Sequence, residues 1–266
     1  NKFGDLSVAK NAMAGISSKI RGLVAGGNTP TELSTIDYIT FSTEGNSADF
    51  GDLTQATSVP ANQVGNNTRG LIGGGQSGPT FTGVISYVTI ATIGNAADFG
   101  DLSVTRGTLA GTSSNIRGVF AAGEVSGTYS NVIDYVTIST TGNATDFGDV
   151  QAIRKGTAGV SNSTRGVFGG GENGSGVSNI LGYVTIATTG NATDFGDLSV
   201  ARTFTGPLSN SVTGIFAGGT DPSATNVMDF ITIGSTGNAS DFGDLIINTG
   251  SQPGGFSNGH GGLVGG

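Results

Sequence analysis

The stretch from Ile133 to Val150 reads Ile-Asp-Tyr-Val-Thr-Ile-Ser-Thr-Thr-Gly-Asn-Ala-Thr-Asp-Phe-Gly-Asp-Val, and the Phe-Gly-Asp near its end recurs along the chain. The tripeptide opens at six positions: Phe3, Phe50, Phe99, Phe147, Phe195 and Phe242. Successive copies are 47, 49, 48, 48 and 47 residues apart. A period of roughly 40 to 50 residues, in units made of short strands, is typical of β-propeller blades. We therefore expect residues 1–266 to form one β-propeller domain whose last repeat is incomplete.

Each repeat is expected to hold four short strands, which we call a, b, c and d in chain order. In the third repeat they fall near residues 109–111, near 119–121, at 133–138, and in the segment that ends at Phe147-Gly-Asp. These segments are rich in Val, Ile, Tyr, Phe and Thr and are bounded by Gly, Asn, Asp and Ser, which favours strands. Gly142-Asn143 predicts a hairpin turn between c and d, because both residue types accept a positive φ.

The two ends of the chain complement each other. The sequence contains six d endings, six a segments and six b strands, but only five c strands. It begins within a d strand at Phe3 and ends within a b strand after His260. We predict an all-β, six-bladed propeller in which both termini close the last blade. Seven blades, with part of the ring outside these residues, is the main alternative. An open stack is a third, and it would leave two sheet edges unpaired.

The order of residue types resembles the kelch repeat. That repeat has an Arg, a small-residue strand, a strand ending in paired glycines such as Gly26-Gly27, a strand with Tyr, and a last strand with one large aromatic residue. Here Phe of Phe-Gly-Asp stands where kelch repeats more often have Trp, and the chain contains no Trp. The resemblance implies a kelch-like propeller fold and no particular activity.

Composition excludes several classes of function. The chain has no Cys, so disulfides, thiolate metal sites and thiol nucleophiles are not available. A net charge of −8 disfavours nucleic acid as a partner, because that binding depends on clustered Lys and Arg. No run of residues approaches the roughly 18 to 20 apolar residues of a membrane helix, so membrane insertion is not expected.

The charged residues follow the repeat. Eight of the eleven basic residues occupy two repeat positions, before strand a (Lys10, Arg106, Arg154, Arg202) and at the start of strand b (Arg21, Arg69, Arg117, Arg165). Eleven of the nineteen acids belong to Asp-Phe-Gly-Asp or its N-terminal remnant. We interpret this arrangement as structural, with each cation donating hydrogen bonds to a recurrent carboxylate or to strand-end carbonyl groups of its own or the adjacent blade.

Motifs that suggest catalysis or metal binding lack their usual companions. Asp-Phe-Gly occurs in kinases, but here no glycine-rich loop, strand Lys or catalytic Asp accompanies it. Asn-Ala-Thr-Asp-Phe-Gly-Asp gathers oxygen atoms that suit calcium, yet it lacks the bidentate Glu of known calcium loops. The single His is His260, with no second His or Cys to assist it. We predict no catalytic site, no metal and no cofactor.

The b–c loops vary while the strands do not. They begin at Asn28, Gln76, Glu124, Glu172 and Thr220, and all are expected on one side of the ring. Variable loops on a rigid frame suit recognition of a polymer or a protein. Five residues are candidates for binding at the loop tips: Phe81, Tyr129, Glu124, Glu172 and Asp221.

A second resemblance concerns function. The repeat at Ile133–Val150, its near copy at Tyr183–Leu198 and the ending at Ser257–Leu263 resemble large virion structural proteins of tailed phages that infect marine cyanobacteria. This resemblance implies a tail-fibre, baseplate or surface protein of the particle, with other virion proteins or a host-surface receptor or glycan as partners. An intracellular kelch-type adaptor and a carbohydrate-active enzyme are the alternative hypotheses. Near-identical blades also permit homo-oligomers.

Overall fold

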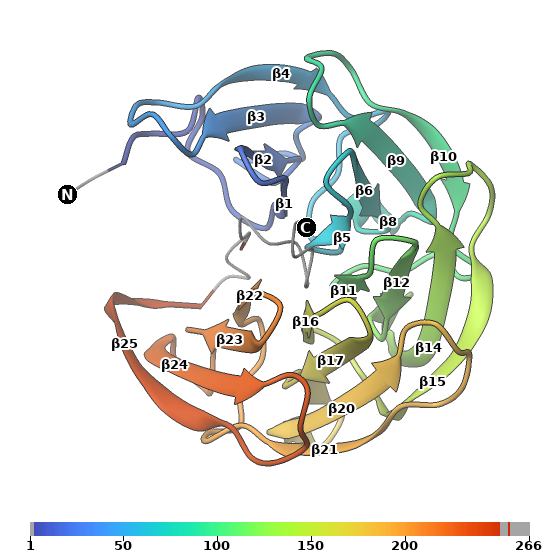
Figure 1. Cartoon of the computed structure of the whole chain (residues 1–266), viewed down its shortest axis with the longest axis vertical. Coiled ribbons are helices and arrows are strands. Elements are labelled where there is room, and N and C mark those ends of the chain that lie inside the picture. Colours follow the sequence, from blue (N-terminus) through green and yellow to red (C-terminus); the bar gives the residue numbers. More distant parts are fainter. Residues whose placement is uncertain (1–2, 251–254, 256–266) are drawn as a thin grey trace.

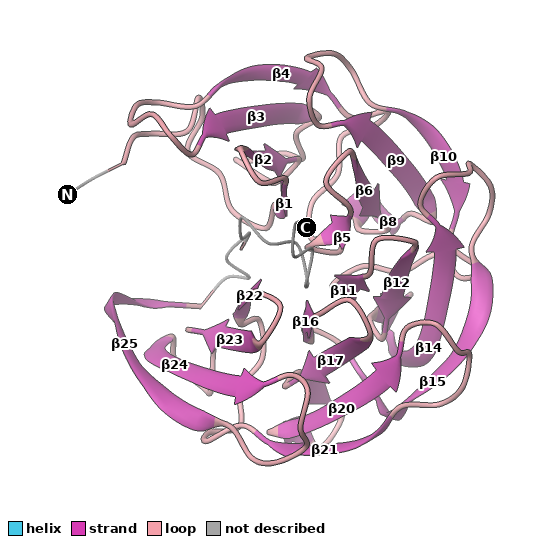
Figure 2. Cartoon of the chain, viewed as in Figure 1, coloured by secondary structure: helices cyan, strands magenta, loops and turns pink. Residues whose placement is uncertain are grey.

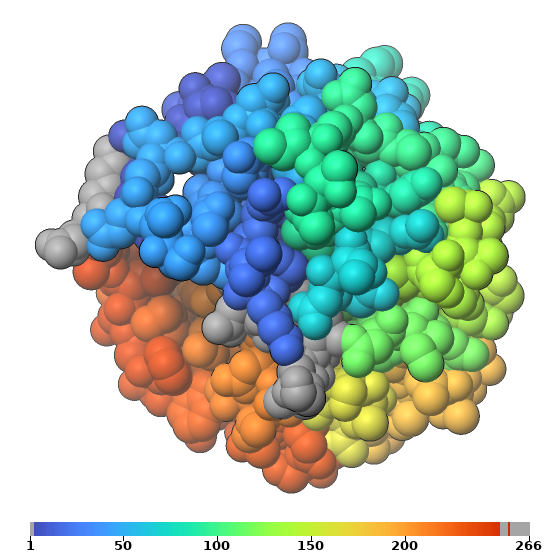
Figure 3. All heavy atoms as spheres, turned by 45° about the horizontal axis from the view of Figure 1, so that its top comes forward, coloured from blue at the N-terminus to red at the C-terminus, as the bar shows by residue number. Residues whose placement is uncertain are grey.

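The computed structural model describes residues 3–250 and Gly255, which form strands, turns and bends without a helix (Figure 2). Five sheets lie around an axis in a β-propeller arrangement, and Figure 3 shows them as neighbouring wedges in sequence order. Each sheet has four antiparallel main strands, which follow one another in chain order from the axis to the rim (Figure 1).

The blades have the following strands. Blade 1 contains β1 (Ala14–Ser17), β2 (Arg21–Ala25), β3 (Thr35–Thr40) and β4 (Ala48–Asp52). Blade 2 contains β5 (Val64–Gly65), β6 (Arg69–Gly73), β9 (Val84–Thr89) and β10 (Ala97–Asp101). Blade 3 contains β11 (Ala110–Ser113), β12 (Arg117–Ala121), β14 (Thr128–Thr137) and β15 (Thr145–Arg154). Blade 4 contains β16 (Ala158–Ser161), β17 (Arg165–Gly169), β20 (Ile180–Thr185) and β21 (Thr193–Asp197). Blade 5 contains β22 (Gly206–Ser209), β23 (Thr213–Ala217), β24 (Thr225–Thr232) and β25 (Ser240–Thr249).

The β-propeller arrangement and the four strands per blade are confirmed, but the number of blades differs from the prediction. The described residues form five blades rather than six, and no strand pairing among them closes the ring. The predicted a and b strands of a sixth blade fall within residues 251–266, of which the structure describes only Gly255.

The core consists of apolar clusters between neighbouring blades. Each of four clusters takes residues from all four strands of one blade and from the b and c strands of the next. The Phe of Phe-Gly-Asp lies in each cluster and is only 1–2% exposed at Phe50, Phe99, Phe147 and Phe195. Its ring packs edge-on against a Tyr of strand c, with centroids 5.9 Å apart for Tyr135 and Phe147. A blade with a neighbour on each side has both faces of its sheet covered, and this is why the strands carry apolar residues on both faces.

The rest of Phe-Gly-Asp joins each blade to the next. The c–d turn of blade 3 lies against strand d of blade 2, where the N–H of Gly142 donates to the carbonyl oxygen of Phe99 at 2.7 Å. Asp101 N–H donates to the side-chain oxygen of Asn143 at 3.1 Å. Gly100 has a φ of +145°, and a Cβ there would clash with the Gly142 backbone, so only glycine fits.

This contact corrects one physical argument from the sequence. Asn143 and its counterparts in the other turns do not have a positive φ, whereas Gly142 has a φ of +156°. Asn is present because its side-chain oxygen accepts a hydrogen bond from the preceding blade.

The Arg at the start of strand b also links neighbouring blades. Arg117 lies over the ring of Tyr135, with its guanidinium carbon 4.4 Å from the ring centroid. Its Nη1 donates to the carbonyl oxygen of Ile186 in the next blade at 3.0 Å. The same pair of contacts recurs at Arg21, Arg69 and Arg165. The predicted structural role of these arginines is therefore confirmed.

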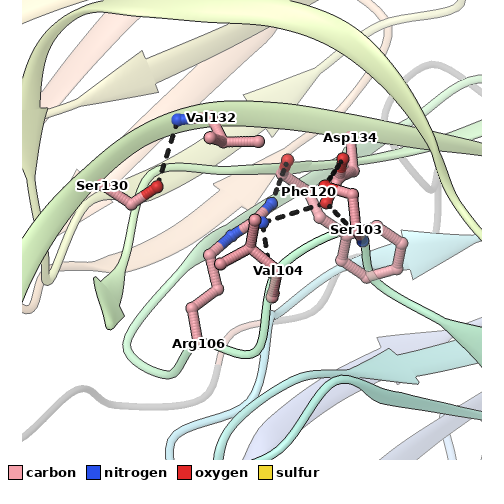
Figure 4. Close-up of polar contacts among 7 residues, drawn as sticks. All are labelled: Ser103, Val104, Arg106, Phe120, Ser130, Val132 and Asp134. Atoms are coloured by element: carbon pink, nitrogen blue, oxygen red, sulfur yellow. Dashed lines mark hydrogen bonds and ion pairs between the residues drawn. The ribbon is translucent and has the colours of Figure 1, made fainter. Parts of the chain in front are cut away.

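The second set of cations donates to backbone carbonyl groups near strand ends, as predicted, but its carboxylate partner differs from the one predicted. Arg106 Nη1 lies 2.9 Å from Asp134 Oδ2, and both side chains are fully buried (Figure 4). The Ser103 hydroxyl donates to the other carboxylate oxygen at 2.6 Å. Arg202 with Asp229 and Lys10 with Asp37 form the same buried pair. The partner is thus an Asp of strand c, whereas the acids of Asp-Phe-Gly-Asp lie mainly at the surface.

The buried ion pair occurs in alternate blades. Blades 1, 3 and 5 contain it, whereas Ser86 occupies the strand c position in blade 2 and Gly182 occupies it in blade 4. In blade 2 the cation is also replaced, because Thr57 stands at the position of Arg106. Blade 2 therefore has neither charge, and blade 4 has a cation alone.

Replacing Asp134 with Asn should destabilise the protein strongly. The change leaves the buried Arg106 guanidinium without its counter-charge, which we expect to lower the free energy of unfolding by about 3 kcal/mol. Chemical denaturation measures this loss. Asp101→Asn, at an exposed carboxylate of Phe-Gly-Asp, is the control and should change stability by less than about 0.5 kcal/mol. Equal effects of the two substitutions would contradict the structural role of the buried pair.

Candidate functional site

The b–c loops lie on one face of the ring, and their bases are tied to the segments that lead into strand a. Isolated bridges join Gly107 to Glu124, Lys155 to Glu172, and Thr203 to Thr220. Three of the loops form small hairpins, namely β7 (Gln76–Ser77) with β8 (Thr80–Phe81), β13 (Glu124–Val125) with the start of β14, and β18 (Glu172–Asn173) with β19 (Gly176–Val177). The loop tips are therefore displayed from a fixed base.

Lys155 brings three of the predicted site residues together. Its Nζ lies 2.8 Å from Glu124 Oε2 and 3.4 Å from Glu172 Oε1. The same Nζ lies 5.4 Å from the ring centroid of Tyr129, within the range of a cation–π contact. Two carboxylates and a phenol ring thus surround one ammonium group at the blade 3–blade 4 boundary.

The charge of Lys155 is set by its surroundings. Burial alone would lower the pKa of Lys155, but hydrogen bonds and the negative charges of Glu124 and Glu172 outweigh burial and raise the pKa above its ordinary value. Lys155 is therefore cationic at neutral pH, and with the two glutamates the cluster has a net charge of −1. Lys155 is not among the residues predicted from the sequence. A signal was present, because Lys155 is charged at a repeat position where the other blades have uncharged residues, namely Asn11, Ser58, Gly107 and Thr203.

The other two candidates lie apart from this cluster. Phe81 is partly buried, and its ring covers the backbone of Gly107, where a Cβ would lie 2.6 Å from the ring. Phe81 therefore packs against the next blade instead of forming an open tip. Asp221 is exposed in the loop of blade 5, where its N–H donates to the carbonyl oxygen of Ser223 at 3.0 Å.

A hollow of ≈ 380 Å³ opens near the axis on this loop face. It is lined by Ala12, Val59, Glu172, Thr203, Phe204, Thr220 and Gly250. Phe204 has a φ of +58°, which is unusual for a large side chain. Its backbone N–H donates to the carbonyl oxygen of Gly156 at 2.8 Å, one of four such bonds that run from blade to blade around the axis. These bonds hold Phe204 at the hollow, where Glu172 supplies a carboxylate.

Arg154, next to Lys155 in the chain, is a buried cation without a carboxylate. Its Nη1 donates to the carbonyl oxygens of Gly170 and Ile180, but Nε and Nη2 have no hydrogen-bond partner among the described residues. Burial lowers the pKa of Arg154 to about 10. Gly182 stands where blades 3 and 5 have Asp, and the side chain of Gln151 occupies the space beside it.

Other kinds of site find no support among the residues that the structure describes. Within residues 3–250 and at Gly255, no group of three His, Asp or Glu side chains is arranged to hold a metal ion. Over the same residues there is no helix of the length and hydropathy that a membrane crossing requires. His260 lies outside the described residues.

Comparison of the chain with models of known protein families and with curated protein sequences gives no match.

Supplying the missing carboxylate in blade 4 should stabilise the protein. The double substitution Gln151→Ser and Gly182→Asp reproduces the serine, aspartate and arginine of blade 3, and we expect it to raise the free energy of unfolding by about 1–2 kcal/mol. Gly182→Asp alone should be less favourable, because its Cβ meets the Gln151 side chain. Denaturant midpoints of the three proteins compare these changes. A double variant no more stable than the unmodified chain would show that Arg154 is already satisfied.

Proposed function

We propose that the chain is a non-enzymatic binding module of a phage particle, which presents its b–c loop face to a host-surface glycan or to another virion protein. The observation that carries the proposal is the contrast between the two parts of each repeat. The strands and their interblade contacts recur almost unchanged, whereas the loop residues at the Lys155 cluster and the axial hollow differ from blade to blade. The placement in a phage particle rests on the sequence resemblance alone.

We also propose that the module is a six-bladed, kelch-like ring closed by both ends of the chain. Contacts at the axis support a sixth blade. A Cβ on Gly111 would clash with the carbonyl oxygen of Asn62 in the preceding blade. In the same way, a Cβ on Gly255 would clash with the carbonyl oxygen of Pro207, and one on Gly15 would clash with that of Gly255. Gly255 thus lies between blades 5 and 1, where an innermost strand would be.

Contacts at the rim support the same proposal. Gly45 N–H donates to the carbonyl oxygen of Phe3 at 2.9 Å, and Asp5 N–H donates to the side-chain oxygen of Asn46 at 3.0 Å. The same two contacts join strand d of a complete blade to the next blade. Phe3–Asp5 therefore occupies the place of a preceding strand d.

The chemistry of the loop face suits a polyhydroxylated ligand. Tyr129 and Phe204 offer aromatic surface, and Glu124 and Glu172 offer hydrogen-bond acceptors on a rigid base. Such combinations of a few polar groups with aromatic side chains are typical of small-ligand sites.

Mass spectrometry of purified particles tests the virion assignment. Peptides of this chain should be present in gradient-purified particles of a phage that encodes it, at a constant ratio to the other structural proteins. Their absence from such particles would end the virion proposal and favour the adaptor or the enzyme.

Binding of labelled protein to host cells tests the loop face. The triple substitution Glu124→Ala, Tyr129→Ala and Glu172→Ala should weaken binding about tenfold or more, because it removes the polar and aromatic contacts together. Ile116→Ala, at a 68% exposed side chain in the a–b turn on the opposite face, should leave binding unchanged. An equal loss in both variants would show that the loop face is not the site.

A further inference from the structure

Arg154 is a buried charge with no opposite charge beside it. The other buried charges that the structure describes form ion pairs, namely Arg106 with Asp134, Arg202 with Asp229, and Asp37 with Lys10. Arg154 is 2% exposed, and no carboxylate oxygen of the described residues lies within 4.0 Å of its nitrogen atoms. The rest of the sequence, residues 1–2, 251–254 and 256–266, contains no Asp or Glu. Burial lowers the pKa of Arg154 to about 10, which still leaves its guanidinium charged at neutral pH.

The guanidinium of Arg154 lies where another blade has a carboxylate beside its cation. Arg154 Nη1 donates to the carbonyl oxygen of Ile180 at 3.0 Å. In blade 1, Lys10 Nζ donates to the carbonyl oxygen at the same repeat position at 3.4 Å, and it also lies 3.0 Å from Asp37 Oδ2. Two residues after that carbonyl group stands Asp37 in blade 1 and Gly182 in blade 4. The space beside Gly182 is therefore the position of the carboxylate that blade 4 lacks.

Blade 4 keeps hydrogen-bond donors around this position. Nη2 of Arg154 has no hydrogen-bond partner among the described residues. In blade 3, the carboxylate of Asp134 accepts from Arg106 Nη1 at 2.9 Å and from the hydroxyl and backbone N–H of Ser103 at 2.6 and 3.2 Å (Figure 4). Gln151 stands at the position of Ser103, and its side-chain amide is a donor that takes the place of the hydroxyl. The donor set thus suits a negative charge that no residue of blade 4 supplies.

The space beside Gly182 is small. A Cβ on Gly182 would clash with the side-chain oxygen of Gln151, so Gln151 fills part of the volume that Ser103 and Asp134 fill in blade 3. A Gln side chain has fewer heavy atoms than those of Ser and Asp together, and Gln151 is exposed to solvent. The remaining space therefore suits a compact anion of one heavy atom, which reaches Arg154 when the Gln151 side chain moves aside.

We propose that blade 4 contains a buried site for one chloride ion, bound between Arg154 Nη2, the side-chain amide of Gln151 and the backbone beside Gly182. The ion takes the place that the carboxylate of Asp134 has in blade 3. Its charge offsets the cost of burying the guanidinium without a partner. Hydrogen bonds between charged groups are stronger than neutral ones, so Nη2 gains more from an anion than from water.

The chloride site lies at the base of the loop face. Arg154 Nη1 donates to the carbonyl oxygens of Gly170 and Ile180, which stand at the two ends of the blade 4 loop that carries Glu172. Lys155, the next residue in the chain, contacts the Glu172 carboxylate. An ion that fixes the guanidinium therefore also holds the two ends of this loop together.

Thermal unfolding in mixtures of sodium chloride and sodium gluconate tests the site at constant ionic strength, because gluconate is too large for the space. The melting temperature should rise as chloride replaces gluconate, by about 3 °C when chloride is about tenfold above its Kd. The double variant Gln151→Ser with Gly182→Asp supplies its own carboxylate, so its melting temperature should not depend on chloride. The stability that this double variant gains should accordingly be largest in gluconate.

Two further variants separate the site from a general effect of salt. Arg154→Thr places at this position the residue that blade 2 has, Thr57, and should abolish the dependence on chloride. Lys19→Thr removes one exposed cation from the a–b turn of blade 1 and should keep the full dependence.

Bromide, which scatters anomalously and replaces chloride, provides an independent measurement. Crystals of the unmodified chain grown in sodium bromide should show an anomalous difference peak beside Arg154 Nη2, and crystals of the double variant should show none there.

Two results would overturn the chloride site. One is a melting temperature of the unmodified chain that does not depend on chloride, or that depends on it as much as that of the double variant does. The other is the absence of a bromide peak beside Arg154, which would show that water satisfies the guanidinium. Detection in particles and binding to host cells depend on neither measurement, so the proposed function can stand or fall separately.

Discussion

The fold depends on contact between neighbouring blades, because a single four-stranded blade has two apolar faces and can bury neither alone. Phe-Gly-Asp provides this contact at three successive residues. Phe fills the space between two blades, Gly allows the next turn to approach, and the N–H of Asp bonds to the Asn of that turn. Because each copy acts on the boundary between two blades, its recurrence at a fixed spacing arranges similar blades around one axis.

Much of this architecture can be predicted from the sequence, since the features that define it are periodic. The strand type, the four strands per blade and the structural role of Arg117 and its counterparts all follow from the repeat. The partner of Arg106 could not be predicted in the same way. Asp134 is an isolated acid within an apolar strand and recurs only in alternate blades, so the repeat favours the more frequent acids of Asp-Phe-Gly-Asp as partners. The number of blades depends on residues 251–266, which diverge from the repeat.

The candidate site, like the fold, can be predicted from the sequence only in part. The sequence predicts Glu124, Tyr129 and Glu172 as loop-tip candidates because they vary from repeat to repeat while the strands stay constant. Lys155, which contacts all three, stands in the segment before strand a, and nothing in the repeat marks that segment as part of the loop face. Only the bridge from Lys155 to Glu172 in the folded chain places it there. The exposed aromatic ring expected of a loop predicts Phe81 as a binding residue, but the small size of Gly107 allows that ring to pack against the next blade. Contacts between blades thus decide which loop residues are accessible to a ligand, and these contacts cannot be inferred from any single repeat.

The alternation of the buried ion pair has a consequence for how this chain is divided into units. Blades 1, 3 and 5 share Ser, a cation and Asp at three separated positions, while blades 2 and 4 depart from that set at two or more of them. The pair recurs about every 96 residues, the sum of the two successive spacings 47 and 49. Blades 2 and 4 differ from each other at the same three positions, so the intervening blades do not repeat one another. The unit within which the buried charges balance is thus the single blade, and a change of charge can be compensated there while the apolar contacts with the neighbouring blades stay the same.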